Sequence, residues 1–124
     1  MTSDLSSSFG LPAGSAWLPQ DEAERRQVTV AFIDMVGSSR LAAMLDPEDM
    51  SELIVAYRRA AGAAIEAHGG YIARFLGDGI LAYWGFPRAR EDDTARAISG
   101  CLAVLDAIDA LNAAGLAQGQ RVSV

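Results

Sequence analysis

The sequence contains a single cysteine, Cys101, so the chain cannot form an internal disulfide. This scarcity is typical of proteins in reducing compartments. Cys101 falls within a helical apolar pattern, and we expect a buried core thiol at this position. Long hydrophobic runs are also lacking, because no stretch approaches the roughly 20 apolar residues that span a bilayer. The N-terminus has no signal-peptide pattern either, so we expect no membrane segment and a cytoplasmic location.

Positive charge is scarce as well. Acidic residues number 16 and basic residues 10, which gives a formal net charge of -6. Such a surface repels the phosphate backbone of nucleic acids, and we expect no nucleic-acid partner. Any polyphosphate bound by this chain would need local neutralisation by a metal ion and by backbone N–H groups.

With 124 residues, the chain is long enough for one domain. Residues 1–20 are rich in serine, glycine and proline and show no hydrophobic periodicity. We interpret residues 1–21 as a flexible leader and residues 22–124 as the folded domain.

Hydrophobic periodicity, caps and turn residues divide this domain into a series of helices and strands. The order strand, helices, strand, hairpin, strand, helix and strand predicts an α+β fold, a ferredoxin-like βαββαβ sandwich that is truncated after the start of its fourth strand. The expected elements are a strand at 28–33, helices at 37–45 and 46–68, strands at 71–76 and 80–84, a helix from 90–93 to 111, and the opening of a strand at 120–124. Residues 77–79 are expected to join the two middle strands, with Asp78-Gly79 as the favoured hairpin-turn pair.

Both long helices are predicted to be amphipathic. On the first of them we expect Arg58 and Arg59 to lie on a solvated face. The expected apolar positions are Met50, Leu53, Ile54, Tyr57, Ala61, Ala64 and Ile65 on the first helix, and Ala97, Ile98, Cys101, Leu105, Ile108 and Leu111 on the second.

Two aspartates stand at the edges of predicted strands. Asp34 ends the first apolar run, and Asp78 lies in the hairpin turn. In this topology the third strand is antiparallel to the first, so the end of one adjoins the start of the other, and the two carboxylates should be neighbours. Taken separately, each could be a structural cap or turn residue. As a pair they predict a site for hard cations that hold phosphates.

The segment that follows Asp34 could complete such a site. Residues Met35, Val36, Gly37, Ser38 and Ser39 lead from a strand into a helix. Backbone N–H groups at such a loop favour anions, and we expect these residues to bind phosphate. The segment has neither the spacing nor the lysine of a Walker loop.

These motifs resemble those of the class III nucleotidyl cyclases, the catalytic domains of adenylate and guanylate cyclases. Residues 32–38 and 74–78 resemble the two metal motifs of that family, and residues 24–30 and 91–97 resemble its bacterial branch. The resemblance implies that catalytic Asp34 and Asp78 hold two divalent cations, Mg²⁺ or Mn²⁺, assisted by the backbone carbonyl of Met35. It also implies a nucleoside triphosphate substrate, conversion to the 3′,5′-cyclic monophosphate and pyrophosphate, and a homodimer or a cyclase-domain partner.

The chain departs from the family pattern in two respects. Arg74 stands where adenylate cyclases carry a lysine that reads adenine, so we expect Arg74 to read the base, with ATP favoured over GTP. The later family motifs, which include an asparagine for the ribose and an arginine for the transition state, are not found in this sequence. We therefore expect the isolated chain to be inactive or nearly so.

Two alternatives stay open at this stage. A diguanylate cyclase of the GGDEF type would share the fold, but Leu76, Gly79 and Ile80 do not match its hairpin. A non-catalytic regulatory or dimerisation module with a degenerate cyclase fold would explain Arg74 and the missing motifs. It would not explain why both aspartates are present.

Overall fold

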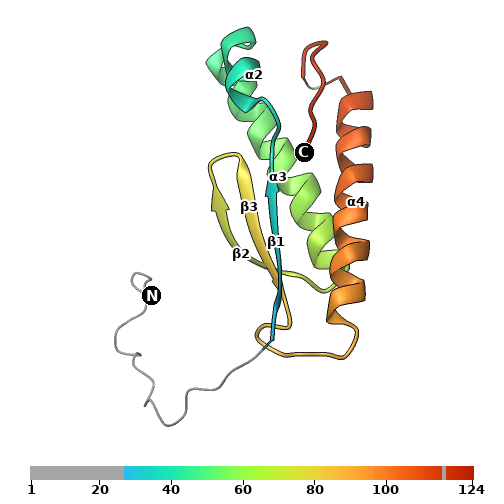
Figure 1. Cartoon of the computed structure of the whole chain (residues 1–124). Helices are drawn as coiled ribbons and strands as arrows, with labels where there is room; N and C mark the ends of the chain where they lie inside the picture. The colour runs from blue at the N-terminus through green and yellow to red at the C-terminus, as the bar shows by residue number, and fades with distance from the viewer. Residues whose placement is uncertain (1–26, 116) are drawn as a thin grey trace, which may run out of the picture.

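A computed structural model describes residues 27–115 and 117–124 (Figure 1). Over these residues the chain forms a three-stranded sheet with two long helices packed against one of its faces, and the predicted α+β sandwich is confirmed. The predicted leader lies outside the described residues. In chain order the elements are β1 (Thr29–Asp34), α2 (Ser38–Met44), α3 (Pro47–Ala67), β2 (Tyr71–Leu76), β3 (Gly79–Trp84) and α4 (Asp93–Ala113).

The sheet has the order β1-β3-β2, and both pairs of strands are antiparallel. The β1–β3 register runs from Thr29 opposite Trp84 to Asp34 opposite Gly79. The β2–β3 turn differs from the expected Asp78-Gly79 turn, because Gly79 already belongs to β3 and pairs with Leu76. The two turn residues are therefore Gly77 and Asp78, and Gly77 has a φ of 63°. A positive φ at the first turn position is the hairpin geometry that selects glycine there.

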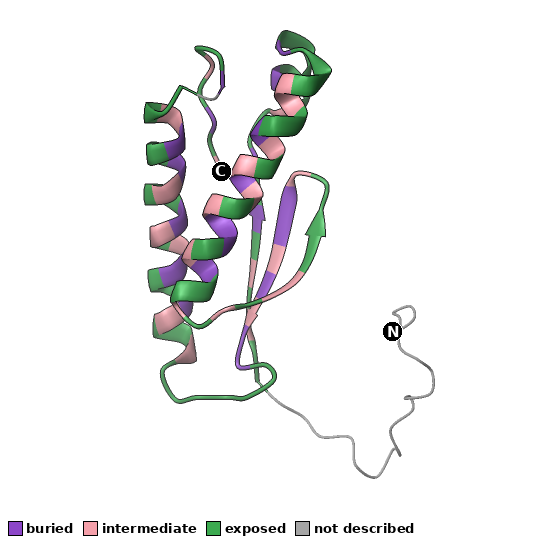
Figure 2. Ribbon diagram, turned by 180° about the vertical axis from the view of Figure 1, so that it is seen from behind, coloured by how far each residue is buried: buried purple, intermediate pink, exposed green. Residues whose placement is uncertain are grey.

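The core lies between the sheet and the two long helices, as the burial colours of Figure 2 show. Leu53, Tyr57, Ala61 and Ile65 of α3 are buried, which confirms the predicted face of this helix. Trp84 of β3 is fully buried, and its Nε1–H donates a hydrogen bond of 3.0 Å to the carbonyl of His68. This bond satisfies the one polar group of the largest side chain in the core.

The predicted apolar stripe of α4 is partly wrong. Ile98 and Leu105 are exposed, at 58% and 47%, and Cys101 is only half-buried. Gly100 lies against the ring of Trp84 instead, and this contact rotates the inner face of α4 away from the bulkier residues. The buried positions of α4 are Ala97, Gly100, Val104, Ile108 and Leu111.

Residues 120–124 do not form the expected fourth strand. The backbone of Val122 is hydrogen-bonded to the side chain of Asn112 instead. Nδ2 of Asn112 donates to the Val122 carbonyl over 2.9 Å, and Oδ1 of Asn112 accepts from the Val122 N–H over 2.8 Å. The segment still approaches the end of β1, because the N–H of Val36 donates to the carbonyl of Ser123 over 2.8 Å. The Asn112 side chain is thus bonded to the backbone N–H and carbonyl with which a strand would pair with its neighbour.

None of the helices in the described part of the chain is both long enough and apolar enough to cross a membrane.

Candidate functional site

The sheet brings the two predicted aspartates to the same place. Asp34 is the last residue of β1 and lies opposite Gly79, the residue that directly follows Asp78 in the chain. The antiparallel pairing of β1 with β3 produces this arrangement, as the predicted topology required. Two carboxylate-bearing residues that are distant in sequence therefore adjoin at one end of the sheet.

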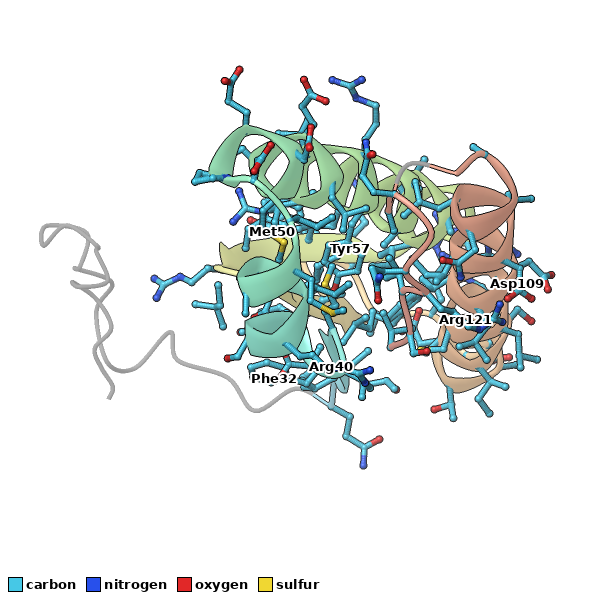
Figure 3. All side chains as sticks on the ribbon, turned by 90° about the horizontal axis from the view of Figure 1, so that it is seen from above. Phe32, Arg40, Met50, Tyr57, Asp109 and Arg121 are labelled. Atoms are coloured by element: carbon cyan, nitrogen blue, oxygen red, sulfur yellow. The ribbon has the colours of Figure 1, made fainter. Side chains whose placement is uncertain are left out.

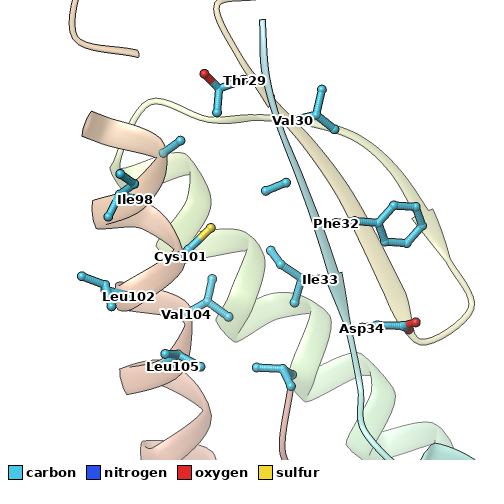
Figure 4. Close-up of a pocket in the computed structure, with 13 residues that line it drawn as sticks. Thr29, Val30, Phe32, Ile33, Asp34, Ile98, Cys101, Leu102, Val104 and Leu105 are labelled. Atoms are coloured by element: carbon cyan, nitrogen blue, oxygen red, sulfur yellow. The ribbon is translucent and has the colours of Figure 1, made fainter. Parts of the chain in front are cut away.

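Asp34 extends from the face of the sheet that the helices leave open. Its neighbours on that face of β1 are Val30 and Phe32, which are 54% and 63% exposed, whereas Ile33 is buried on the helix side. Figure 4 shows Phe32 and Asp34 on the side of β1 opposite α4. A Cβ placed at Gly79 would lie 3.3 Å from Oδ1 of Asp34, so the absence of a side chain at position 79 leaves room beside this carboxylate.

A bulge in β2 places Arg74 on the same open face. Tyr71 pairs with Tyr83 and Ile72 with Ala82, but the next partner, that of Leu81, is Arg74 and not Ala73. Because strand side chains alternate between faces, this extra residue moves Arg74 to the face that carries Phe32 and Asp34. Leu81, the partner of Arg74, is also the partner of Phe32, so Arg74 lies two positions along β3 from the Asp34–Gly79 pair.

The charges of Asp34 and Asp78 act on Tyr57, a residue of the core. This side chain is fully buried between α3 and the sheet (Figure 3), and its hydroxyl has no hydrogen-bond partner among the described residues. Burial raises the pKa of Tyr57 to about 12, with further contributions from the charges of Asp34 and Asp78 and a smaller opposing one from Arg58. The two carboxylates therefore act together on one buried group, as expected of neighbouring charges.

The predicted phosphate loop is engaged at Met35 and Val36 and open at Gly37. The Met35 side chain is buried, and the N–H of Val36 is already engaged by Ser123. Gly37 adopts a left-handed conformation with a φ of 67°, and a Cβ there would meet nothing within 4 Å, so the loop is open at this point. Ser38 and Ser39 then begin α2, where the first N–H groups have no partner within the helix.

Sequence reasoning missed two arginines beside this loop. Arg40 and Arg121 line a pocket of about 330 Å³ together with Val36, Gly37 and residues 119–120. Arg121 also pairs with Asp109 at 3.5 Å, as Figure 3 illustrates, but both side chains are largely exposed. No sequence pattern indicates this pocket, because residues 119–121 are distant in sequence from Gly37 and only the fold brings them together.

The donor set at the aspartate pair suits a hard divalent cation. Carboxylate oxygens are the ligands that Mg²⁺ prefers, and Mg²⁺ is commonly held by one or two carboxylates with substrate phosphates completing the shell. Within the described part of the chain, no histidine, cysteine or acidic residue joins Asp34 and Asp78 to make a group of three. The residues present therefore fit a metal that arrives with a phosphate ligand better than a closed structural site.

Arg58 is not the solvated residue that the sequence predicted. Its Nη2 donates a hydrogen bond of 2.6 Å to the carbonyl of Gly77, and its guanidinium lies over the ring of Phe75 with Cζ 5.1 Å from the ring centroid. The arginine thereby connects α3 to the hairpin that carries Asp78.

An apolar groove runs between β1 and α4 (Figure 4), and its lining reaches Asp34 at the end of β1. Its volume is about 500 Å³, and its lining includes Ile33, Ile98, Leu102 and Val124. Cys101 also lines it, and burial raises the pKa of this thiol. The groove offers few polar groups to a phosphate, so its chemistry suits apolar side chains and not a nucleotide.

Comparison with known proteins points to one family. The family model of the adenylate and guanylate cyclase catalytic domain matches residues 21–124. Adenylate cyclase 1 of Rhizobium meliloti is 30% identical over 97 residues, which is 78% of this chain and 15% of that protein. An uncharacterised protein of the same organism, R02095, is 36% identical over 84 residues, or 68% of this chain and 8% of its own length. The chain thus spans a small part of these relatives.

Solved structures agree with this comparison. The guanylyl cyclase Cya2 superposes with a TM-score of 0.73 at 29% identity, covering 79% of this chain and 51% of that one. The adenylyl cyclase CyaB from P. aeruginosa superposes with a TM-score of 0.74 at 26% identity, covering 81% and 52%. The chain therefore spans about half of the length of these solved domains.

Proposed function

The chain belongs to the adenylate and guanylate cyclase catalytic domain family, and from this premise we propose that it supplies the metal-binding part of a nucleotide cyclase site. The proposed reaction converts a nucleoside triphosphate to the 3′,5′-cyclic monophosphate and pyrophosphate, for use in intracellular signalling. The observation that carries this proposal is the position of Asp34 opposite Gly79 and therefore beside Asp78.

In the proposed site Asp34 and Asp78 provide carboxylate oxygens, and the backbone carbonyl of Met35 assists them. Divalent cations bound there, Mg²⁺ or Mn²⁺, would lower the pKa of the ribose 3′-hydroxyl and neutralise phosphate charge. The N–H groups of Gly37, Ser38 and Ser39 receive the β- and γ-phosphates at the open loop. The 3′-hydroxyl would lose its proton to water, and the 3′-oxygen would form a bond to the α-phosphorus while the bond from that phosphorus to the α–β bridging oxygen breaks and pyrophosphate leaves.

We assign base reading to Arg74. The β2 bulge supports this role because it places Arg74 on the open face, two positions along β3 from the Asp34–Gly79 pair. A guanidinium donates from a planar fork to acceptors on a purine edge. ATP is the favoured substrate, although the relatives include an adenylate cyclase and a guanylyl cyclase.

The open face of the sheet also suggests a partner. Phe32 and Val30 are strongly exposed, and an aromatic cluster of Tyr71, Tyr83 and Phe86 continues the surface beyond them. Monomeric proteins rarely leave an apolar surface of this kind uncovered. We propose that this face pairs with a second cyclase domain, most simply another copy of the chain. The later part of the domain would complete the site, and the isolated chain is proposed to be inactive or nearly so.

Binding, and not turnover, is therefore the test of this proposal. We would titrate the isolated chain with Mn²⁺ and a non-hydrolysable ATP analogue by isothermal titration calorimetry. The expected result is nucleotide binding that requires Mn²⁺ and that weakens by at least about tenfold in Asp34→Ala and in Asp78→Ala, since each change removes a carboxylate ligand.

Asp106→Ala is the matched control, because it removes an exposed carboxylate of α4 away from the site. We expect it to bind like the wild type. If the chain binds the nucleotide equally with and without Mn²⁺, or not at all, the proposed metal site is refuted. Failure to bind would favour the alternative, a non-catalytic regulatory or dimerisation module with a degenerate cyclase fold.

A further inference from the structure

Arg58 reaches from α3 to the tip of the β2–β3 hairpin. The bond from its Nη2 to the carbonyl of Gly77 is 2.6 Å long, which is short for a hydrogen bond between an arginine and a backbone carbonyl. Gly77 directly precedes Asp78, so the bonded carbonyl belongs to the peptide unit that contains the N–H of Asp78. A constraint on this peptide unit is a constraint on the position of the carboxylate.

A second contact fixes the arginine itself. Its guanidinium lies 5.1 Å from the ring centroid of Phe75, which is on the helix side of β2, opposite the face that carries Arg74. A planar cation over an aromatic ring gains a favourable interaction and loses freedom to rotate. Nε of Arg58 is also buried, and it has no hydrogen-bond partner among the described residues. The side chain is thus held over the ring of Phe75 as well as at Gly77.

A half-buried arginine on a helix would normally pair with an acid or keep its charged end hydrated. Arg58 forms no ion pair with any residue that the structure describes, and it directs its charge to the hairpin. Tips of hairpins are ordinarily among the more mobile parts of a domain. This geometry is therefore best explained by a role in holding the turn.

We propose that Arg58 is a positioning residue, which holds the Gly77–Asp78 turn in the conformation that presents Asp78 to a divalent cation beside Asp34. The inference rests on the proposed function for its metal, and on the contacts of Arg58 for its mechanism. The arginine touches neither substrate nor metal. It acts by reducing the conformational freedom that Asp78 would otherwise lose when a cation binds.

The test compares Arg58→Met with Arg59→Met. Both changes remove one positive charge from neighbouring positions of α3, but Arg59 is exposed and, among the described residues, forms no hydrogen bond or ion pair with the hairpin. Amide hydrogen exchange at residues 76–79 is measured by NMR without metal, and the affinity for Mn²⁺ alone is measured by paramagnetic broadening. In Arg58→Met we expect faster exchange at the turn and a Mn²⁺ affinity lower by about tenfold, as found for residues that orient metal ligands.

Arg59→Met should change neither quantity. If Arg58→Met does not fold, Arg58→Lys, which retains the charge and most of the stem, replaces it and should show both changes to a smaller degree. Exchange and Mn²⁺ affinity equal to those of the wild type would overturn the proposal. If the wild type binds no Mn²⁺ either alone or together with the ATP analogue, the proposed function fails, and the exchange rates still decide whether Arg58 holds the turn.

Discussion

The carboxylate of Asp34 faces Gly79 across the β1–β3 pair, where a Cβ would lie 3.3 Å from Oδ1. The same Cβ would lie 3.4 Å from the carbonyl oxygen of Leu76 and 3.5 Å from that of Ile33. A methyl group could therefore not move away from the carboxylate without approaching the backbone. Glycine at this position keeps space free beside one of the two proposed metal ligands.

This relationship leads to a prediction for Gly79→Ala. The added methyl group displaces the carboxylate of Asp34 by a few tenths of an ångström, because the backbone atoms on its other sides cannot yield as easily as a side chain. We expect the Mn²⁺ affinity to fall by about threefold to tenfold while the fold is retained. Titration of both proteins with Mn²⁺, followed by paramagnetic broadening, measures the change.

Gly77→Ala is the contrasting variant. A Cβ at Gly77 would meet nothing within 4 Å, but the backbone there has a φ of 63°. Its expected cost is about 1–2 kcal/mol in the free energy of unfolding, the usual penalty of a left-handed conformation. Unchanged Mn²⁺ affinity in Gly79→Ala would contradict the argument that the open space at position 79 serves Asp34.

The packing of Trp84 gives a prediction about stability. A Cβ at Gly100 would lie 2.8 Å from Cζ2 of this ring, and a Cβ at Gly70 would lie 2.7 Å from the same atom. The ring is held between the two glycines and cannot shift away from one without meeting the other. In Gly100→Ala, the gain in helix propensity of about 1 kcal/mol is outweighed by overpacking of about 1–3 kcal/mol.

We therefore expect Gly100→Ala to lower the free energy of unfolding by up to about 2 kcal/mol overall. Urea denaturation, followed by the fluorescence of the buried indole, measures this quantity. Ser99→Ala is the control, since Ser99 is an exposed residue of the same helix and should change stability by less than about 0.5 kcal/mol. Equal stability of the two variants would show that Trp84 can repack.

The raised pKa of Tyr57 predicts how stability changes in alkaline solution. The folded protein binds the phenolic proton more tightly than the unfolded chain does, because the folded pKa is about 12 and the ordinary value is 10.0. The resulting stabilisation is fully present below pH 10.0 and is lost as the pH rises to about 12. The free energy of unfolding should thus decrease over this interval.

Tyr57→Phe should remove that part of the decrease, as measured by urea denaturation at a series of pH values. The change breaks no hydrogen bond among the described residues, because the hydroxyl of Tyr57 makes none there. Tyr71→Phe, at an exposed position, is the control and should leave the decrease in place. A wild-type stability that stays constant up to pH 12 would contradict the assignment.

The meeting of Asp34 and Asp78 could be predicted from sequence because it depends on topology alone. Once the order of strands was inferred, antiparallel pairing of the first and third strands placed Asp34 beside the hairpin turn. The buried face of α3 could be predicted equally well, since bulky apolar residues repeat along it at helical spacing.

Features that depend on small residues or on long side chains could not be predicted from the sequence pattern in this way. The inner face of α4 centres on Gly100, and a pattern that counts bulky residues selected Ile98 and Leu105 instead. The contact of Arg58 with Gly77 joins a helix to a turn through a long flexible side chain, which no spacing rule predicts. The pairing of Asn112 with Val122 likewise replaced a strand that the sequence pattern favoured.

The last prediction concerns the open face of the sheet. Phe32 extends from that face and is 63% exposed, whereas Leu102 belongs to α4, on the opposite side of β1, and is 58% exposed (Figure 4). Replacing either side chain with serine removes a similar apolar surface, but only Phe32 lies on the face that we propose to pair with a second copy. We expect Phe32→Ser to weaken self-association by about tenfold or more, because buried aromatic residues contribute most to such interfaces, and Leu102→Ser to leave it unchanged. Sedimentation velocity over a range of protein concentrations measures both, and a dimer that survives Phe32→Ser but dissociates in Leu102→Ser would move the interface to the groove between β1 and α4.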